Sequence, residues 1–461
     1  TSVTGVQTCA LPISALLLGV TALGVVPAAP TASAADSLGA GGEYFPVAPA
    51  RIYDSANAAP GGRVDASGSV DVPVVGLAGI PASDVLAVAV NVTIADAPGR
   101  GFASVSPSDY RPGSTAATSL INYQYSGHTV PNFGIIGVGT EGAITVDLDS
   151  RVAGTARVIV DVFGFVATSS FVGTTDIGVD DGARMVTVTP QRVVDTCNAG
   201  GPTNGATMTA GQSIEVPIRG VGPVPNSANV SAVVVNMTGI NNRSGNTKTY
   251  LAATPERVPN GSETSNGNYP AGVTKANLAI VPVNDDGSIF VYNNRGRIHV
   301  ALDVVAYLEA GGDDASRTGR IVPLEAPFRS FDTRQTEFGA SRLGFSSWED
   351  WSFEAFANSV RLEDVAVGAQ SGLFGNLTAV GLERLYPTEP VKSFITVNPA
   401  IGGPFPTEPG NSNLNFDESG SVANASVVTY GAKDGDANMV SAYNSNGRTH
   451  YILDVYAVIL D

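Results

Sequence analysis

Arginine and aspartate side chains recur in a pattern that could form ion pairs or hold a cation. Each third of the chain begins with Pro-x-Arg-x-x-Asp and ends with a β-branched strand that carries Asp-Val. The arginines are Arg51, Arg192 and Arg329, the first aspartates are Asp54, Asp195 and Asp332, and the strand aspartates are Asp161, Asp303 and Asp454. A carboxylate inside an apolar strand is costly unless it is paired. The pattern therefore predicts a bidentate Arg–Asp pair that fastens the first segment of each copy to its last strand.

A cation site is the alternative for the same residues. Asp54, Asp161 and a nearby Asn oxygen are ligands of the kind that Ca²⁺ takes. The neighbouring arginine would compete with the metal, so the ion pair is favoured and no cofactor is expected. Residues 434–438 (DGDAN) resemble half of a calcium loop, but Met439 stands where that loop needs Gly. A hairpin turn is predicted there instead.

Asparagine and serine residues recur between the two aspartates of every copy. Each copy carries Asn-x-Thr at the end of a strand, then Ser-x-x-Asn, then a further Asn. The Asn-x-Thr residues are Asn91, Asn236 and Asn376, the Ser-x-x-Asn segments are Ser119–Asn122, Ser265–Asn268 and Ser412–Asn415, and the further residues are Asn132, Asn277 and Asn424. The Asn-x-Thr amide is predicted to hydrogen-bond into the following turn. These markers recur in one order, roughly 140 residues apart, and so indicate an internal repeat.

The strands that must position these residues have a period of two. In the last strand of the first copy, Val158, Val160 and Val162 alternate with Ile159 and Asp161. Further β-branched runs are separated by Pro-Gly, Asn-Gly and Asp-Gly turn signals, and residues 359–367 are the nearest candidate for a helix. The sequence predicts an all-β protein of three tandem antiparallel β-sandwich (jelly-roll-like) domains. A closed barrel in each copy and a propeller-like assembly of the three are the alternatives.

The domain limits follow from the repeat. The β repeats are placed at residues 43–167, 184–309 and 320–461, and the small, polar and acidic linkers between them at residues 168–183 and 310–319. Residues 1–13 resemble the translation of a sequencing adapter, and residues 14–35 match the apolar core and cleavage region of a secretory signal peptide. We therefore expect an extracellular or cell-envelope protein with no membrane span in the mature chain.

Composition and cysteine content exclude several classes of protein. The formal net charge is −17, which argues against nucleic acid and anionic membrane as partners. Cys197 is the only cysteine after residue 13, so no disulfide framework is expected, and the side chain is predicted to be a small buried filler. No Gly-x-Ser-x-Gly, HExxH or Cys/His metal pattern occurs. His299 and His450 occupy matching positions four residues before the strand aspartate, and they are predicted to be its partners.

At these residues the chain resembles the repeat modules of secreted, cell-surface actinobacterial proteins. Their pattern runs Pro-x-Arg-x-x-Asp-Thr-Arg, Asn-Val-Thr, Ser-x-x-Asn and Asp-Val-x-Gly-Tyr, and the resemblance covers residues 43–461. The third copy keeps Thr333 and Arg334 after its aspartate, whereas only the first copy keeps the glycine after Asp-Val, as Gly164. The resemblance implies a surface or envelope-associated module, and it carries over no catalytic residues.

Aromatic side chains are the candidates for ligand binding, because binding sites combine exposed rings with a few polar groups. The candidates are Tyr123, Tyr125, Tyr269 and Trp348, and ligand function is expected where the copies diverge, around Tyr123, Asn268 and Trp348. The leading hypothesis is a secreted, non-enzymatic interaction protein that binds envelope glycan, exopolysaccharide or a partner protein. A structural surface-layer or fibre subunit, which would self-associate, is the alternative, and a secreted hydrolase is less favoured.

Overall fold

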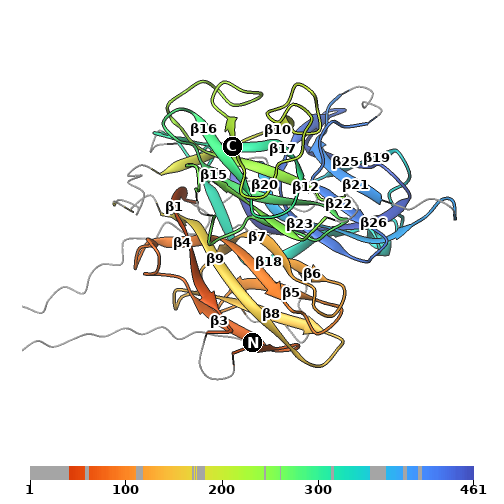
Figure 1. The fold of residues 1–461 in the computed structure, drawn as a ribbon, viewed down its shortest axis with the longest axis horizontal. Coiled ribbons are helices and arrows are strands. Elements are labelled where there is room, and N and C mark those ends of the chain that lie inside the picture. Colours follow the sequence, from red (N-terminus) through yellow and green to blue (C-terminus); the bar gives the residue numbers. More distant parts are fainter. Residues whose placement is uncertain are drawn as a thin grey trace, which may run out of the picture. The chain divides into compact units, whose positions relative to one another are not determined.

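The computed structural model describes residues 41–57, 62–110, 118–168, 171, 173, 182–242, 246–259, 261–312, 316–353, 370–387, 392–402 and 408–461. These residues belong to one compact unit, and their regular structure is nearly all β-strand (Figure 1). The described helical element is a single 3-10 turn, η2, at Thr336–Phe338. The adapter-like segment, the signal-peptide remnant and the candidate helix at residues 359–367 lie outside the described residues, as do parts of both linkers.

The strands follow the three sequence repeats, which we call repeats 1, 2 and 3. Repeat 1 contains β1 (Glu43–Asp54), β2 (Val64–Asp65), β3 (Ser69–Pro73), β4 (Val85–Ala95), β5 (Gly101–Pro107), β6 (Ile121–Tyr123), β7 (Val130–Gly137), β8 (Ala143–Ser150) and β9 (Thr155–Ala167). Repeat 2 contains β10 (Ala183–Asp195), β11 (Ser213–Pro217), β12 (Val230–Ile240), β13 (Thr249–Thr254), β14 (Gly267–Tyr269), β15 (Thr274–Pro282), β16 (Ser288–Asn293) and β17 (His299–Ala310). Repeat 3 contains β18 (Ile321–Asp332), β19 (Ser347–Ser352), β20 (Gln370–Glu383), β21 (Lys392–Pro399), β22 (Leu414–Asp417), β23 (Val422–Thr429), β24 (Gly431–Lys433), β25 (Asp436–Asn444) and β26 (Arg448–Leu460).

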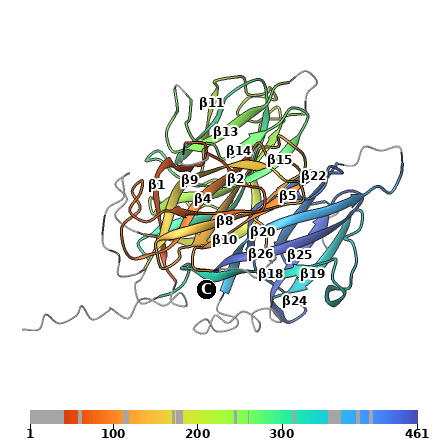
Figure 2. The ribbon, with the colours of Figure 1, turned by 90° about the horizontal axis from the view of Figure 1, so that it is seen from below.

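The same pairing order occurs in each repeat and defines two sheets. What we call the inner sheets run β1-β9-β4-β7, β10-β17-β12-β15 and β18-β26-β20-β23, and the outer sheets run β3-β8-β5-β6, β11-β16-β13-β14 and β19-β25-β21-β22. Figure 2 shows β18, β26 and β20 of the inner sheet of repeat 3 and β25 and β19 of its outer sheet. All the pairs are antiparallel, and this is the strand order of a jelly roll. The predicted all-β, sandwich-like fold is confirmed.

Local turn chemistry explains why the strands reverse where they do. The segment that resembles a calcium loop is the turn between β24 and β25, where Lys433 pairs with Asp436. Asp434 and Gly435 between them have φ values of 55° and 98°. Positive φ at both central residues is typical of the type I′ hairpin turn, which favours Asp-Gly. The predicted hairpin turn is therefore confirmed.

The inner sheets are buried on both faces. One face packs on the outer sheet of the same repeat, as in the cluster of Val216, Val235 and Ile289 in repeat 2. The other face contributes to a cluster that joins all three repeats and includes Val90 and Phe374. Strands covered on both faces read as continuous apolar runs, which is why Ala87–Ala95 of β4 contains no exposed residue.

The repeats contact one another at two levels, and the second of these levels joins repeat 1 to repeats 2 and 3. At one level β7, β15 and β23, which occupy equivalent positions at the edges of the three inner sheets, contact one another. At the other, β1 pairs with β10 through Tyr44 and Ala183, and Gly42 forms a bridge with Ile321 just before β1 and at the start of β18. The repeats therefore share a central core, and residues that occupy equivalent positions on β7, β15 and β23 meet there.

Candidate functional site

An Arg–Asp pair joins the first and last strands of each repeat. The antiparallel register places Arg51 opposite Asp161, and the equivalent residues pair in the other repeats. Each guanidinium donates two hydrogen bonds to one carboxylate, at 2.8 and 3.2 Å in repeat 1, 2.9 and 3.1 Å in repeat 2, and 2.8 and 3.1 Å in repeat 3. The aspartate side chains are at most 2% exposed. The predicted bidentate fastening is present in all three repeats.

Burial and hydrogen bonding act on these carboxylates in opposite directions. Burial raises the pKa of Asp161, Asp303 and Asp454, and the hydrogen bonds from the paired arginines lower it. Asp454 also accepts a hydrogen bond from the backbone N–H of Ser119, at 2.9 Å from Oδ2. These donors occupy the oxygens that a hard cation would need. Among the residues with described positions, no group of three or more His, Cys, Asp or Glu side chains could hold a metal ion.

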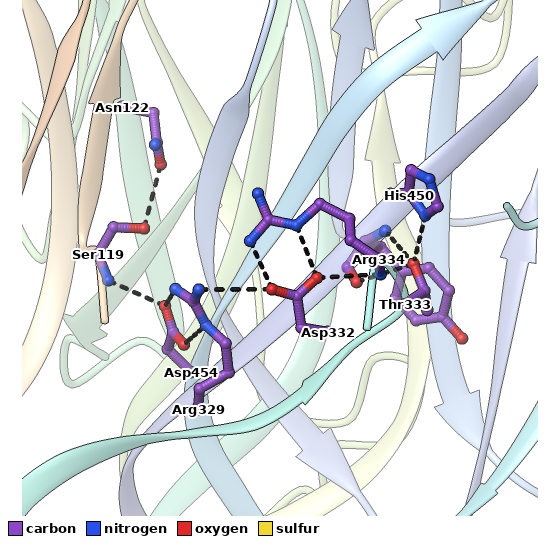
Figure 3. Close-up of polar contacts among 9 residues, drawn as sticks. Ser119, Asn122, Arg329, Asp332, Thr333, Arg334, His450 and Asp454 are labelled. Atoms are coloured by element: carbon purple, nitrogen blue, oxygen red, sulfur yellow. Dashed lines mark hydrogen bonds and ion pairs between the residues drawn. The ribbon is translucent and has the colours of Figure 1, made fainter. Parts of the chain in front are cut away.

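The aspartate of the start motif has further partners of its own, and in repeat 3 Asp332 also forms an ion pair of 3.5 Å with Arg329, which binds the strand aspartate Asp454 (Figure 3). Asp54 accepts a hydrogen bond of 2.7 Å from Nε of Arg157, and Asp332 one of 2.7 Å from Nε of Arg334. His450, which occupies the position of Arg157 in repeat 3, contacts Thr333 at 3.1 Å between Nδ1 and Oγ1.

The matching histidine of repeat 2, His299, contacts Thr196 at 3.3 Å. The prediction that His299 and His450 are partners of the strand aspartate is therefore wrong. The antiparallel register places this position beside the segment that follows the first strand, where Thr196 and Thr333 lie.

The Asn-x-Thr residues connect the repeats in a closed cycle. Each Nδ2 donates to the carbonyl oxygen of a Ser-x-x-Asn serine in another repeat: Asn91 to Ser265, Asn236 to Ser412, and Asn376 to Ser119. Repeat 1 thus bonds to repeat 2, repeat 2 to repeat 3, and repeat 3 to repeat 1. The prediction that these amides bond into their own following turn is wrong, because β4, β12 and β20 point them into the shared core. The recurrence of both markers in each copy was the only signal of this pairing in the sequence.

A second asparagine from β7 or β23 reinforces two of the three junctions. Asn132 Nδ2 donates to Asn376 Oδ1, and Asn424 Nδ2 donates to Asn236 Oδ1, both at 2.8 Å. The oxygens of Asn132 and Asn424 accept backbone N–H groups of the neighbouring repeat at 3.0 and 3.2 Å. All four side chains are at most 1% exposed, so these bonds lie in the interior, where an unmade bond is costly.

The junction between repeats 1 and 2 is less complete. Asn277 Nδ2 donates to the Pro131 carbonyl at 3.4 Å rather than to an asparagine. Within the part of the chain that the structure describes, Oδ1 of Asn91 and Oδ1 of Asn277 are buried without a hydrogen-bond partner. Repeats 1 and 2 are joined additionally by the β1–β10 pairing and by an ion pair of 2.8 Å between Arg184 and Glu43.

A cleft of about 800 Å³ opens where the three repeats meet, and we call it the junction cleft. Its lining includes the last residue of each Ser-x-x-Asn marker: Asn122, Asn268 and Asn415. In repeats 1 and 3 the asparagine Oδ1 accepts a hydrogen bond from its own marker serine, at 3.4 and 3.2 Å. Among the described residues, the Nδ2 groups of Asn122 and Asn415 have no acceptor, so they are free to donate. These marker residues recur in the sequence, but nothing there indicated that they line a common cleft.

Two exposed aromatic rings flank the junction cleft. Tyr125 is 52% exposed and Phe345 is 55% exposed, and both line it. Tyr125 stacks on His128 with ring centroids 4.2 Å apart. The two residues lie in a turn closed by a 3.2 Å bond from His128 N to Tyr125 O. Gly127 within this turn has φ of 80°, as the third position of a type II turn requires.

His128 presents a neutral ring to the cleft. Its Nδ1 accepts a hydrogen bond of 3.1 Å from the backbone N–H of Gln124, so the proton of the neutral imidazole is on Nε2. Burial, followed by the nearby charge of Lys275, lowers the pKa of His128 to about 4. The ring is therefore a hydrogen-bond donor at neutral pH.

The four aromatic residues predicted as ligand platforms have different environments. Tyr125 lies at the cleft, but Tyr123 and Tyr269 are fully buried. Their hydroxyls donate to the carbonyls of Phe102 and Met237, both at 3.2 Å. Their assignment as platforms is wrong because they alternate inward on β6 and β14.

Trp348, the fourth candidate, is half-buried and packs on Tyr443, with ring centroids 5.0 Å apart. It does not line the junction cleft, whereas Tyr443 does.

Cys197 is exposed and is not the buried filler that was predicted. It follows the end of β10, in a turn where its backbone N–H donates to Asp195 at 2.8 Å. Sequence reasoning missed Phe345 and Lys275, which line the cleft but belong to no repeated motif.

The chain has little similarity to known proteins. No family model matches the chain, and no curated protein does. One solved structure with weak likeness is the N-terminal CBM22-1–CBM22-2 tandem domain of Xyn10C from Paenibacillus barcinonensis, at 13% identity and a TM-score of 0.15, covering 58% of this chain and 94% of that one. Another is Sulfolobus turreted icosahedral virus, at 9% identity and a TM-score of 0.16, covering 85% of this chain and 83% of that one. Likeness at this level carries no argument about function. Among the described residues, no helix has the length and apolar character needed to cross a bilayer.

Proposed function

We propose that the chain is a secreted, non-enzymatic carbohydrate-binding protein of the cell surface, and that its three repeats build one glycan site, the junction cleft. The observation that carries this proposal is the combination of the exposed rings of Tyr125 and Phe345 with the amides of Asn122 and Asn415 in a cleft of about 800 Å³. A sugar ring presents an apolar face of C–H groups and a rim of hydroxyl groups. The aromatic rings can stack on the face, and the asparagine amides can donate hydrogen bonds to the hydroxyl oxygens.

The position of the rings supports a binding role over a packing role. Tyr125 and Phe345 come from repeats 1 and 3, outside the hydrophobic clusters of those repeats. Exposing a large aromatic ring brings no folding stability. Exposed rings that gather at one cleft are the usual mark of a binding surface.

A glycan array followed by calorimetry on the full chain tests the proposal. The native protein is expected to bind at least one envelope glycan or exopolysaccharide fragment, and Tyr125→Ala or Phe345→Ala to weaken that binding. Tyr386→Ala is the matched control, since Tyr386 is 65% exposed and does not line the cleft. Equal binding by all three variants, or release of reducing sugar during the titration, would refute the proposed role.

A further inference from the structure

We infer that the junction cleft selects a saccharide that carries an isolated acidic group, and that Lys275 receives this group. The inference rests on the proposed glycan-binding function and specifies the chemical class of the ligand. It starts from one side chain, which is buried in the cleft wall although it carries an ammonium group.

Lys275 is 8% exposed and lines the junction cleft. Within the described parts of the chain, its Nζ forms no hydrogen bond and no ion pair. By contrast, Lys433, which is also partly buried, lies 2.6 Å from Asp350. A buried charge without a partner is strongly unfavourable. An anion in the cleft would supply the missing partner.

The position of Lys275 in the repeat shows that packing does not require a lysine. Lys275 lies two residues before Asn277, and the residues two before Asn132 and Asn424 are Val130 and Val422. Residues i and i+2 of a strand share a face, so all three side chains lie on the same strand face as the asparagine two residues later, and all three line the junction cleft. They lie next to what we call the asparagine layer, which consists of the buried asparagines at the junctions, Asn91, Asn132, Asn236, Asn277, Asn376 and Asn424. Valine fills this position in repeats 1 and 3, and only repeat 2 places a cation there.

Several other polar groups of the cleft are also hydrogen-bond donors. Asn122 and Asn415 direct their Oδ1 atoms to their own serines, which leaves the Nδ2 groups. His128 keeps its proton on Nε2 because Nδ1 accepts from Gln124. Donors from three elements together with an ammonium group favour a ligand rich in acceptors, such as a carboxylate on a sugar ring.

The remaining charges of the lining limit the kind of anion. Glu408, Asp417 and Lys392 also line the cleft, and no ion pair within the described residues links Lys275 to either carboxylate. The chain as a whole carries a net charge of −17, which repels polyanions at long range. One acidic group on an otherwise neutral saccharide would form an ion pair with Lys275 and would meet less of this long-range repulsion than a polyanion. Burial also lowers the pKa of Lys275 to about 8, so the side chain is mostly protonated at neutral pH.

The test compares ligands that differ only in the acidic group. Uronate-containing oligosaccharides and the same oligosaccharides after reduction of the carboxyl group are titrated into the full chain and into the Lys275→Met and Lys392→Met variants. The native protein is expected to bind an acidic member about tenfold more tightly than its reduced counterpart, as a charged hydrogen bond would give. Lys275→Met should abolish that ratio, whereas Lys392→Met, which removes an exposed charge from the same cleft, should keep it.

Other outcomes separate this inference from the proposed function. If both members of a pair bind equally and Tyr125→Ala weakens both, the glycan function stands and the inference about Lys275 is overturned. A ratio that persists in Lys275→Met also overturns it. If neither member of any pair binds to the native protein, the inference about Lys275 is overturned, and the glycan array decides the proposed function separately. Lys275→Met is expected to fold, because valine occupies the equivalent positions, and a melting curve together with Lys275→Gln as a second variant verifies this.

Discussion

The asparagine layer and the junction cleft are adjacent regions of the same strands, but they differ in how they use the repeat. In the layer the residue type is the same in every copy, as at Asn132, Asn277 and Asn424. Two residues earlier, at the cleft, the equivalent positions hold valine, lysine and valine. Positions that keep one identity join the repeats to each other, and positions that diverge give one side of the assembly its own chemistry.

The asparagine layer itself is not uniform. Two junctions carry Asn–Asn bonds of 2.8 Å, and the junction between repeats 1 and 2 leaves two buried amide oxygens without partners among the described residues. Those two repeats are joined by strand pairing and by the Arg184–Glu43 ion pair. Repeats 1 and 2, whose inner sheets are joined by strand pairing, thus have fewer asparagine hydrogen bonds between them than the other two pairs of repeats.

Removing a strand aspartate should have the largest effect. Asp454→Ala leaves the guanidinium of Arg329 without its buried partner and also removes an acceptor for Ser119. The free energy of unfolding is expected to fall by about 3–5 kcal/mol. Urea titration followed by fluorescence measures this, with Asp286→Ala in an exposed turn as the control. A loss below about 1 kcal/mol would mean that the pair contributes little beyond its own desolvation.

The asparagine cycle should show unequal junctions. Asn376→Ala removes a donor to Ser119 and an acceptor for Asn132, so we expect a loss of about 2–3 kcal/mol. Asn91→Ala removes one bond and one unpartnered oxygen, and the expected loss is about 1 kcal/mol. The difference between the two variants in the same urea titration is the informative quantity. Equal losses would contradict the unequal bonding of the junctions.

Lys275→Met should stabilise the protein. Because burial lowers the pKa of Lys275 to about 8, the charged form opposes folding at neutral pH. The stability contribution of the neutral amine is present above the ordinary lysine pKa and is lost as the pH falls through about 8. Removing the amine should raise the free energy of unfolding at pH 7 by roughly 2 kcal/mol. Unchanged or lower stability at pH 7 would show that Lys275 is not an uncompensated charge in the ligand-free protein.

Tyr125→Ala should separate binding from stability. The ring is half-exposed and stacks only on His128 among the described aromatic rings, so its removal should change the unfolding free energy by less than about 0.5 kcal/mol. Loss of a stacking face should weaken glycan binding about tenfold, measured by calorimetry. A large loss of stability would assign the ring to packing instead.

The sequence predicted the contacts within a repeat better than the contacts between repeats or the cleft, for a physical reason. A repeated motif reports a requirement that every copy shares, so the Arg–Asp pairs that join the first strand of each copy to its last could be inferred from Arg51 and Asp161 and their equivalents. The Asn91–Ser265 contact depends on how one copy meets the next, and no period within a copy specifies that. Phe345 and Lys275 carry no repeat signal, so only the folded arrangement places them with Tyr125.

A further expected effect is the pH dependence contributed by His128. Its pKa is lowered to about 4 by burial and by Lys275, whereas an unfolded histidine titrates near 6.5. The unfolded chain therefore binds the proton first, so the stability that His128 contributes is complete above about pH 6.5 and is lost as the pH falls toward 4. The pKa values of Asp54 and Asp332 are also lowered, so their contribution to stability also falls on acidification. This contribution is the same in the native protein and in a variant that lacks only His128.

The comparison with His128→Gln isolates the histidine. Unfolding free energies at pH 7 and pH 5 are measured for both proteins, and the native protein is expected to lose more stability between the two values than the variant. The difference should shrink in the Lys275→Met background, because Lys275 is one of the two causes of the shift. A loss that is identical in both proteins would show that the ring titrates equally in the folded and unfolded states. The ring would then be mostly a charged imidazolium below about pH 6.5, and not the neutral Nε2 donor proposed for the cleft.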